Sequence, residues 1–110
     1  MGLAALMVLT LLWSQPAWGD VVGSETPGSR LFQQHCIGCH VGGGNIIRRG
    51  KTLKLKALER QGIANPDSIA RIAAEGIGSM AGYGNQLGTE GPDVVGQWVW
   101  EQAQAGWPRS

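Results

Sequence analysis

The sequence predicts a small all-α domain of about four helices. Four segments carry helix start signals, either a capping residue or a proline in the first turn, and each ends near a glycine. None of the segments between them shows a convincing strand pattern. The length of 110 residues suits one domain, and a chain with 43% apolar and 15% charged residues is typical of a globular protein.

The first helix is expected to begin at Pro27 and to run to about Cys36, with Thr26 as its N-cap. Proline suits the first helical position because its missing N–H would have no intrahelical partner there. Three consecutive glycines at residues 42–44 then predict a loop, because glycine is a poor residue for helices and strands. Such a loop can closely approach another part of the molecule.

The two middle helices are delimited by similar signals. One is expected over residues 52–61, with Thr52 at its start and Gly62 as a left-handed cap at its end. The other is expected to follow Asn65 as N-cap and to run over residues 66–76. Its apolar face is predicted from three residues: Ile69, Ile72 and Ala73.

Residues 76–88 are expected to form a loop that glycine interrupts repeatedly. The last helix is expected to use Thr89 as its cap and Pro92 in its first turn, and to stop at Gly106 and Pro108. Its apolar face is predicted from four residues at helical spacing: Val94, Val95, Trp98 and Val99.

Residues 1–19 are expected to be a signal peptide that is cleaved from the domain. An apolar run at residues 3–13 (LAALMVLTLLW) is followed by a Ser-Gln-Pro break and a small-x-small site at residues 17–19. The run is shorter than the roughly 20 residues that a membrane span needs. Cleavage before Asp20 would leave residues 20–110 as one domain with no span. An uncleaved anchor is the alternative, because no Lys or Arg precedes the run.

All cysteines and histidines of the chain lie in the string QHCIGCH at residues 34–40. A zinc site, a redox-active dithiol and a covalently attached haem could each use part of this string. Zinc is disfavoured because it needs four ligands, and His35 and His40 each adjoin a cysteine, which makes one tetrahedron difficult to close. A redox dithiol is disfavoured because Cys36 and Cys39 follow a helix rather than a strand.

The haem hypothesis uses C-x-x-C-H as one unit. Cys36 and Cys39 are expected to attach haem c covalently, and His40 to ligate its iron from one side. Met80 is the only methionine outside the signal segment and lies in a glycine-rich loop, so it is expected to be the second axial ligand. His/Met ligation favours ferrous iron and leaves no open position for substrate. His35 is expected to have no ligand role.

Two other functions are excluded by charge and spacing. The net charge is +1 and the longest basic run is Arg48-Arg49, so nucleic acid is not an expected partner. Residues 44–52 resemble a phosphate-binding G-x-x-x-x-G-K-T loop, but the spacing is one residue too long and no strand precedes it. Lys51 is therefore expected to be a solvated charge and Thr52 a helix cap.

Taken together, these motifs resemble class I cytochromes c, and most closely the cytochrome c6 family of cyanobacteria and algae. The resemblance covers nearly all of residues 20–107. It is carried by CIGCHVGGGNII at 36–47, by KTL at 51–53, by MAGYGNQL at 80–87, which is similar to the family's M-P-A-F-G-G-R-L, and by the terminal segment at 98–107. It implies a class I cytochrome c fold of about four helices around one haem c.

The resemblance also implies which residues join the two terminal helices. Gly28 and Phe32 lie eight and four residues before Cys36, as in the family's first helix. Val95 and Trp98 are expected to pack on them, because the small glycine lets the helices cross closely.

Three positions depart from the family's pattern. Ala81 replaces the proline after the ligand methionine, which predicts a less rigid loop. Gln86 replaces an arginine that the resemblance implicates in docking to photosystem I, and Ile72 replaces a glutamine near the haem. These departures indicate a divergent branch of the family.

The predicted function is that of a monomeric one-electron carrier, not an enzyme, in the thylakoid lumen or periplasm. The resemblance implies redox proteins as partners, among them the cytochrome b6f complex, photosystem I or a terminal oxidase. The alternative is a haem-based sensor or small-ligand-binding protein in which Met80 leaves the iron. A thiol oxidoreductase is a third hypothesis.

Overall fold

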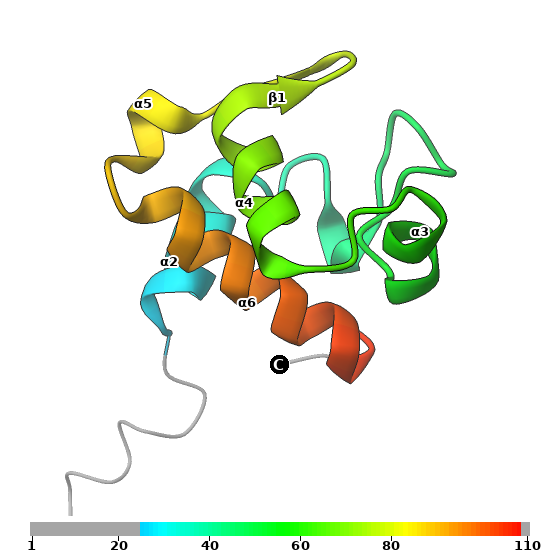
Figure 1. The fold of residues 1–110 in the computed structure, drawn as a ribbon. Coiled ribbons are helices and arrows are strands. Elements are labelled where there is room, and N and C mark those ends of the chain that lie inside the picture. The colour runs from blue at the N-terminus through cyan, green and yellow to red at the C-terminus, as the bar shows by residue number, and fades with distance from the viewer. Residues whose placement is uncertain (1–24, 109–110) are drawn as a thin grey trace, which may run out of the picture.

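The structure, a computed structural model, describes residues 25–108 (Figure 1). The expected signal segment and its cleavage point before Asp20 lie outside the described residues. In chain order the regular elements are α2 (Pro27–His35), a 3₁₀ turn (Val41–Gly43), α3 (Leu55–Arg60), α4 (Pro66–Glu75), β1 (Gly76–Ile77), β2 (Met80–Ala81), α5 (Gly84–Leu87) and α6 (Gly91–Ala105). The prediction of an all-α domain is confirmed. None of the helices in this part of the chain has the length and apolar character that a membrane span requires.

The helix α6 is the element on which the others pack. It makes its largest contacts with α4 and α2, and Figure 1 shows α4 above it and α2 beside it. Helix α3 lies on the opposite side of the view from α5. The buried core between these helices is formed by eight apolar residues: Phe32, Leu58, Ile69, Ala73, Leu87, Val95, Val99 and Ala103.

The predicted caps of α2 and α4 are both present. Thr26 Oγ1 accepts a hydrogen bond from the Ser29 N–H at 3.1 Å, and Asn65 Oδ1 accepts one from the Ser68 N–H at 2.8 Å. Each cap is followed by a proline in the first turn. The two helices therefore begin where sequence signals alone placed them, because both signals act over a few residues.

Helices α2 and α6 cross closely at Gly28. A Cβ placed on Gly28 would lie 2.5 Å from Trp98 Cβ, a separation that real side chains do not reach. The ring of Trp98 lies 5.0 Å from that of Phe32, centroid to centroid, and Val95 is 1% exposed beside them in the core. The predicted packing between the two terminal helices is confirmed.

The contact between α4 and α6 also depends on a glycine. A Cβ on Gly96 would lie 2.9 Å from Ala70 Cβ and from the carbonyl oxygen of Pro66. Because α6 carries a glycine at this crossing and α4 an alanine, the backbone of α4 closely approaches α6. Helix α6 thus fixes the positions of both α2 and α4.

The second helix begins later than the sequence predicted. The prediction placed Thr52 at its start, but α3 begins at Leu55, and Thr52 Oγ1 instead accepts a bond from the Lys54 N–H in a turn. The Leu53 N–H donates to the Gly43 carbonyl at 2.7 Å, and the Leu53 carbonyl accepts from the Trp107 indole at 3.0 Å. Leu53 is therefore tied to two distant segments and cannot take part in a helix there. The predicted end is confirmed, since Gly62 has a φ of +73°.

The segment 76–88 is more regular than expected. It contains the short antiparallel pair β1–β2, with Gly76 opposite Ala81 and Ile77 opposite Met80, and then α5. The prediction of Thr89 as a cap is wrong: the N-cap of α6 is Glu90, which makes no side-chain capping bond. Strands of two residues carry no periodic signal, which is why the sequence did not reveal them.

We predict that Gly28→Ala destabilises the haem-loaded protein by about 1–3 kcal/mol, because the added methyl group overpacks the α2–α6 crossing. Helix propensity alone would favour alanine by about 1 kcal/mol, so the sign of the change separates the two effects. The measurement is a denaturant titration. The control is Gly50→Ala, where a Cβ meets nothing within 4 Å. Equal stability of Gly28→Ala and wild type would show that the helices can move apart.

Candidate functional site

The C-x-x-C-H segment forms a tight turn directly after α2. Cys36 is the C-cap of this helix, and its N–H donates to the Phe32 carbonyl. The N–H groups of Cys39 and His40 both donate to the Cys36 carbonyl, at 3.2 and 3.1 Å. The turn places both cysteines and the histidine on one short segment, which is bonded to the core residue Phe32 through the Cys36 N–H. The packing of α2 on α6 fixes the position of this segment.

His40 is a buried polar side chain whose ring orientation is fixed. It is 9% exposed, and its Nδ1 lies 2.7 Å from the Gly44 carbonyl oxygen. A carbonyl oxygen only accepts, so Nδ1–H is the donor and the lone pair is left on Nε2. This is the arrangement by which proteins orient a metal-ligating histidine, with one ring nitrogen held by a backbone carbonyl and the other free for the metal.

The two thiols have different surroundings. Both are free, with Cys36 half-buried and Cys39 exposed. Burial raises the pKa of the Cys36 thiol to about 11, so this thiol is protonated at neutral pH. A redox-active dithiol needs a lowered pKa, because the thiolate is the nucleophile. Residues 25–108 also hold no cluster of three or more Cys, His, Asp or Glu side chains placed for a metal ion.

The loop after His40 is clamped by Trp107, which follows α6. Its indole N–H donates to the Leu53 carbonyl at 3.0 Å, and its ring covers Gly43, where a Cβ would lie 2.5 Å from the ring. Gly43 also has a φ of +81°, a conformation that side-chain-bearing residues rarely adopt. The glycine run thus closely approaches another part of the chain, as the sequence predicted, and that part is Trp107.

Met80 lies in the β1–β2 hairpin that follows α4. The hairpin is tied back to α4 because the Tyr83 N–H donates to the Ala73 carbonyl at 2.8 Å. Gly76 turns the chain at a φ of +84°, and a Cβ there would lie 2.5 Å from the Met80 carbonyl oxygen. Ala81, expected to loosen this loop, is paired with Gly76 in the hairpin. Met80 itself is half-buried.

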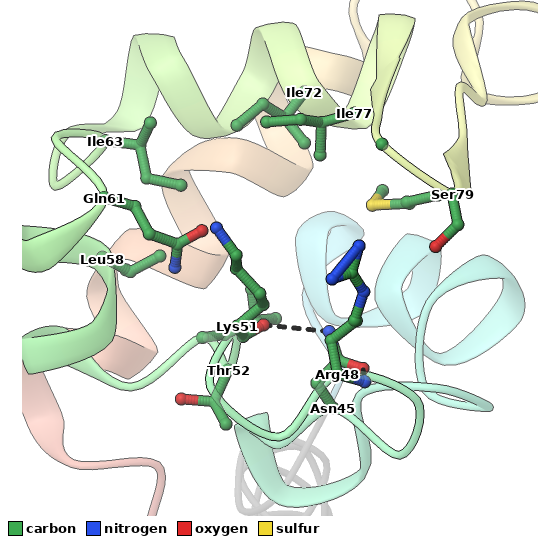
Figure 2. A pocket seen from close by; sticks show the side chains of 13 residues that line it. Asn45, Arg48, Lys51, Thr52, Leu58, Gln61, Ile63, Ile72, Ile77 and Ser79 are labelled. Atoms are coloured by element: carbon green, nitrogen blue, oxygen red, sulfur yellow. Dashed lines mark hydrogen bonds between the residues drawn. The ribbon is translucent and has the colours of Figure 1, made fainter.

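A pocket opens in front of Met80 (Figure 2). Its wall is largely apolar and is formed by Met80 and five further apolar residues: Leu53, Leu58, Ile63, Ile72 and Ile77. Two cations, Arg48 and Lys51, line it from the opposite loop, and no carboxylate among the described residues does. Figure 2 shows both cationic side chains reaching from this loop toward the side that holds Ile72 and Ile77.

The structure places the predicted site residues in two groups. Met80 lines the pocket, whereas Cys36, Cys39 and His40 are not among the lining residues. The two groups belong to neighbouring parts of one scaffold, because α2 and α4 both pack on α6. His35, for which no ligand role was expected, faces Tyr83 with 6.0 Å between ring centroids.

These residues fit haem c. The C-x-x-C-H turn supplies two free thiols and an oriented imidazole, and the pocket supplies a thioether on an apolar wall. Haem c combines an apolar macrocycle with two carboxylates, so the two cations that line the pocket suit its charge as well. Sequence reasoning missed Arg48 and treated Lys51 as a solvated charge. Lys51 is exposed, but it lines the pocket.

Comparisons with known proteins agree with this fit. The family model described as cytochrome c oxidase, cbb3-type, subunit III matches residues 23–99. A cytochrome c6-like protein of Nostoc sp. (strain PCC 7120 / SAG 25.82 / UTEX 2576) is 40% identical over 80 residues, which cover 73% of this chain and 72% of the relative. A cytochrome c6 of Aphanizomenon flos-aquae is 40% identical over 82 residues, 74% of this chain and 94% of the relative.

Solved structures show the same likeness. The crystal structure of cytochrome c6B from Synechococcus sp. WH8102 is 56% identical, with a TM-score of 0.74, and the match covers 78% of this chain and all of that one. Oxidized cytochrome c6A from Arabidopsis thaliana is 36% identical, with a TM-score of 0.70 over 76% of this chain and 94% of that one.

The fold and the comparisons define a class I cytochrome c, a small protein that carries one electron on a covalently attached haem c. Within this class the chain belongs to the cytochrome c6 family. The resemblance drawn from the sequence is confirmed.

We predict that Gly43→Ala destabilises the haem-loaded protein by at least about 1 kcal/mol more than Gly62→Ala. Both glycines have positive φ, at +81° and +73°, so both variants carry the backbone cost of about 1–2 kcal/mol. Only Gly43 lies under the Trp107 ring; a Cβ on Gly62 meets nothing within 4 Å. Denaturant titrations of the two variants give the difference. Equal losses would show that Trp107 does not clamp the loop.

Proposed function

We propose that Cys36 and Cys39 hold haem c through thioether bonds and that His40 and Met80 are the axial ligands of its iron. The observation that carries the proposal is the buried His40 ring, whose Nδ1–H is held by the Gly44 carbonyl immediately after the two cysteines. Nε2 is thereby left as the coordinating nitrogen. Met80 supports the second ligand because its hairpin presents it to a largely apolar pocket.

The residues of the chain suit electron transfer better than substrate chemistry. The haem iron, when bound, supplies the reversible change between ferrous and ferric states. His40 is held by its hydrogen bond and Met80 by a hairpin tied to α4, an arrangement that suits ligands needing little movement when the charge of the iron changes. With both axial positions filled, no position is left for a substrate. We therefore propose that the protein is an electron carrier without enzymatic activity.

We propose that the protein works outside the compartment in which it is made, in a thylakoid lumen or periplasm, as a monomer. Support comes from the signal-like segment at residues 1–19 and from C-x-x-C-H, since haem attachment takes place on the far side of a membrane. A relative from Arabidopsis thaliana is named cytochrome c6, chloroplastic. The partners are then membrane redox complexes, among them cytochrome b6f, photosystem I or a terminal oxidase. No observation favours the sensor hypothesis.

We predict that Met80→Ala keeps its haem but loses the far-red band by which a ferric spectrum reports a methionine–iron bond. Carbon monoxide should then bind the reduced protein readily. The reduction potential should fall because a thioether ligand favours ferrous iron. Axial ligands vary haem potentials over roughly 0.8 V, so we expect a fall that a redox titration detects easily. Ser79→Ala is the control, because Ser79 directly precedes Met80 and lines the same pocket. An unchanged spectrum and potential in Met80→Ala would remove this residue from the ligand set.

We predict that Gln86→Arg speeds electron donation to photosystem I by a few-fold at low salt, because a charge on an interface acts mainly on the association rate. Gln86 is exposed on α5, near the hairpin that carries Met80. The gain should vanish at high salt, where exposed charges are screened. The reduction potential should not change. A rate that does not respond to the arginine would place the docking surface elsewhere.

We predict that Ile72→Gln raises the reduction potential by the equivalent of roughly 1 kcal/mol, the size of one polar interaction. Ile72 is half-buried on α4 and lines the pocket, so an amide there can orient its dipole toward the haem and favour the ferrous state. A redox titration measures the shift. A lower potential in the variant would contradict the dipole explanation while leaving the ligand assignment intact.

A further inference from the structure

The loop between the C-x-x-C-H turn and α3 brings positive charge to the pocket. Arg48 and Lys51 both line it, together with four neutral polar residues: Asn45, Thr52, Gln61 and Ser79. Within the described part of the chain, neither cation forms an ion pair; the pair found there joins Arg30 to Glu25. The pocket therefore presents two positive charges that no carboxylate of residues 25–108 pairs with.

The loop conformation that directs Arg48 to the pocket is set by Asn45. Its Oδ1 accepts from the N–H of Ile47 at 3.0 Å and from the N–H of Arg48 at 2.8 Å, and its Nδ2 donates to the Lys51 carbonyl at 2.9 Å. The Lys51 N–H closes the turn by donating to the Arg48 carbonyl at 2.9 Å. The loop is thus organised by one side chain rather than left to vary.

The same loop is attached to the haem-binding turn. The Ile46 N–H donates to the Cys39 carbonyl at 3.0 Å, directly before the residues that carry the charges. The backbone of Arg48 thus belongs to a loop bonded to the haem-binding turn, and its side chain lines the same pocket as Ser79 and Met80 of the hairpin. Arg49, the next residue, is exposed like Arg48 but does not line the pocket.

We infer that Arg48 is a positioning residue for the anionic side of bound haem c and that its charge holds the reduction potential up. The inference rests on the proposed function, because it needs haem in this pocket. Haem c carries two carboxylates, and the planar guanidinium of Arg48 suits a carboxylate through its paired donors. A permanent positive charge beside the haem stabilises the ferrous form, which has one positive charge fewer than the ferric form.

This role complements the apolar residue at position 72. Ile72 lines the pocket and has no side-chain dipole. A nearby cation therefore shifts the reduction potential of the iron more than it would if a polar amide stood at position 72. Solvent reaches Arg48 at the open side of the pocket, so its effect is partly screened. We expect its removal to change the ferric–ferrous equilibrium constant about tenfold, which is about 59 mV for a one-electron couple.

The test compares redox titrations of the haem-loaded Arg48→Gln and Arg49→Gln variants. Each removes one positive charge from adjacent positions, but only the first changes the pocket. Arg48→Gln should lower the reduction potential by about 59 mV, the equivalent of a tenfold change in the equilibrium constant. Arg49→Gln should change the potential by less than about a third of that value. Arg48→Lys should keep most of the wild-type value. Equal shifts in the two glutamine variants, or no shift in Arg48→Gln, would overturn the inference.

The far-red band of the ferric spectrum separates this inference from the proposed function. A wild-type protein without covalent haem or without this band would contradict the proposed ligands, whatever Arg48 does. An intact band with an unshifted potential in Arg48→Gln contradicts only the role of Arg48. If Arg48→Gln itself loses the band, the Arg48→Lys variant, which keeps the charge, decides. A lowered potential in Arg48→Lys with its band intact contradicts the inference. An unchanged potential in Arg48→Lys supports it.

Discussion

The close packing of α2 and α4 on a single helix, α6, is the constraint on which the rest of the structure depends. Gly28 permits one crossing and Gly96 the other, since a Cβ at either position would overlap with the facing helix. The C-x-x-C-H turn follows α2, and the hairpin with Met80 follows α4. The positions of the two proposed axial ligands are thus set by two helix crossings rather than by the loops that carry them.

Local bonds then fix each ligand within this frame. The Gly44 carbonyl orients the His40 ring, and strand pairing together with the Tyr83–Ala73 hydrogen bond holds the Met80 hairpin. The chain beyond α6 closes the arrangement, because Trp107 packs over Gly43 and bonds to Leu53. An electron carrier gains from such rigidity, since ligands that keep their places as the iron changes charge need little rearrangement. The same rigidity is unfavourable for a sensor that works by releasing Met80.

Most features that depend on neighbours in sequence were predicted, whereas features that depend on distant segments were predicted only where the family resemblance implied them. The caps Thr26 and Asn65, the ligand motif and the Gly28–Trp98 contact all follow from short spacings or from the family resemblance. The start of α3 was placed too early because bonds from Gly43 and Trp107 to Leu53 cannot be read from local sequence. Arg48 was missed because its direction depends on how the Asn45 side chain folds the loop. Its spacing of three residues from that asparagine was the one available signal.

The central claim is that one haem c is attached to both cysteines of the turn after α2. The most direct measurement is the mass of the intact mature protein under denaturing conditions, after treatment with an alkylating reagent, followed by mapping of the haem-bearing peptide. We expect the polypeptide mass plus one haem, no alkylated thiol, and haem on the peptide that contains Cys36 and Cys39. A polypeptide of unmodified mass, or alkylation of either cysteine in protein purified from its own host, would contradict the account.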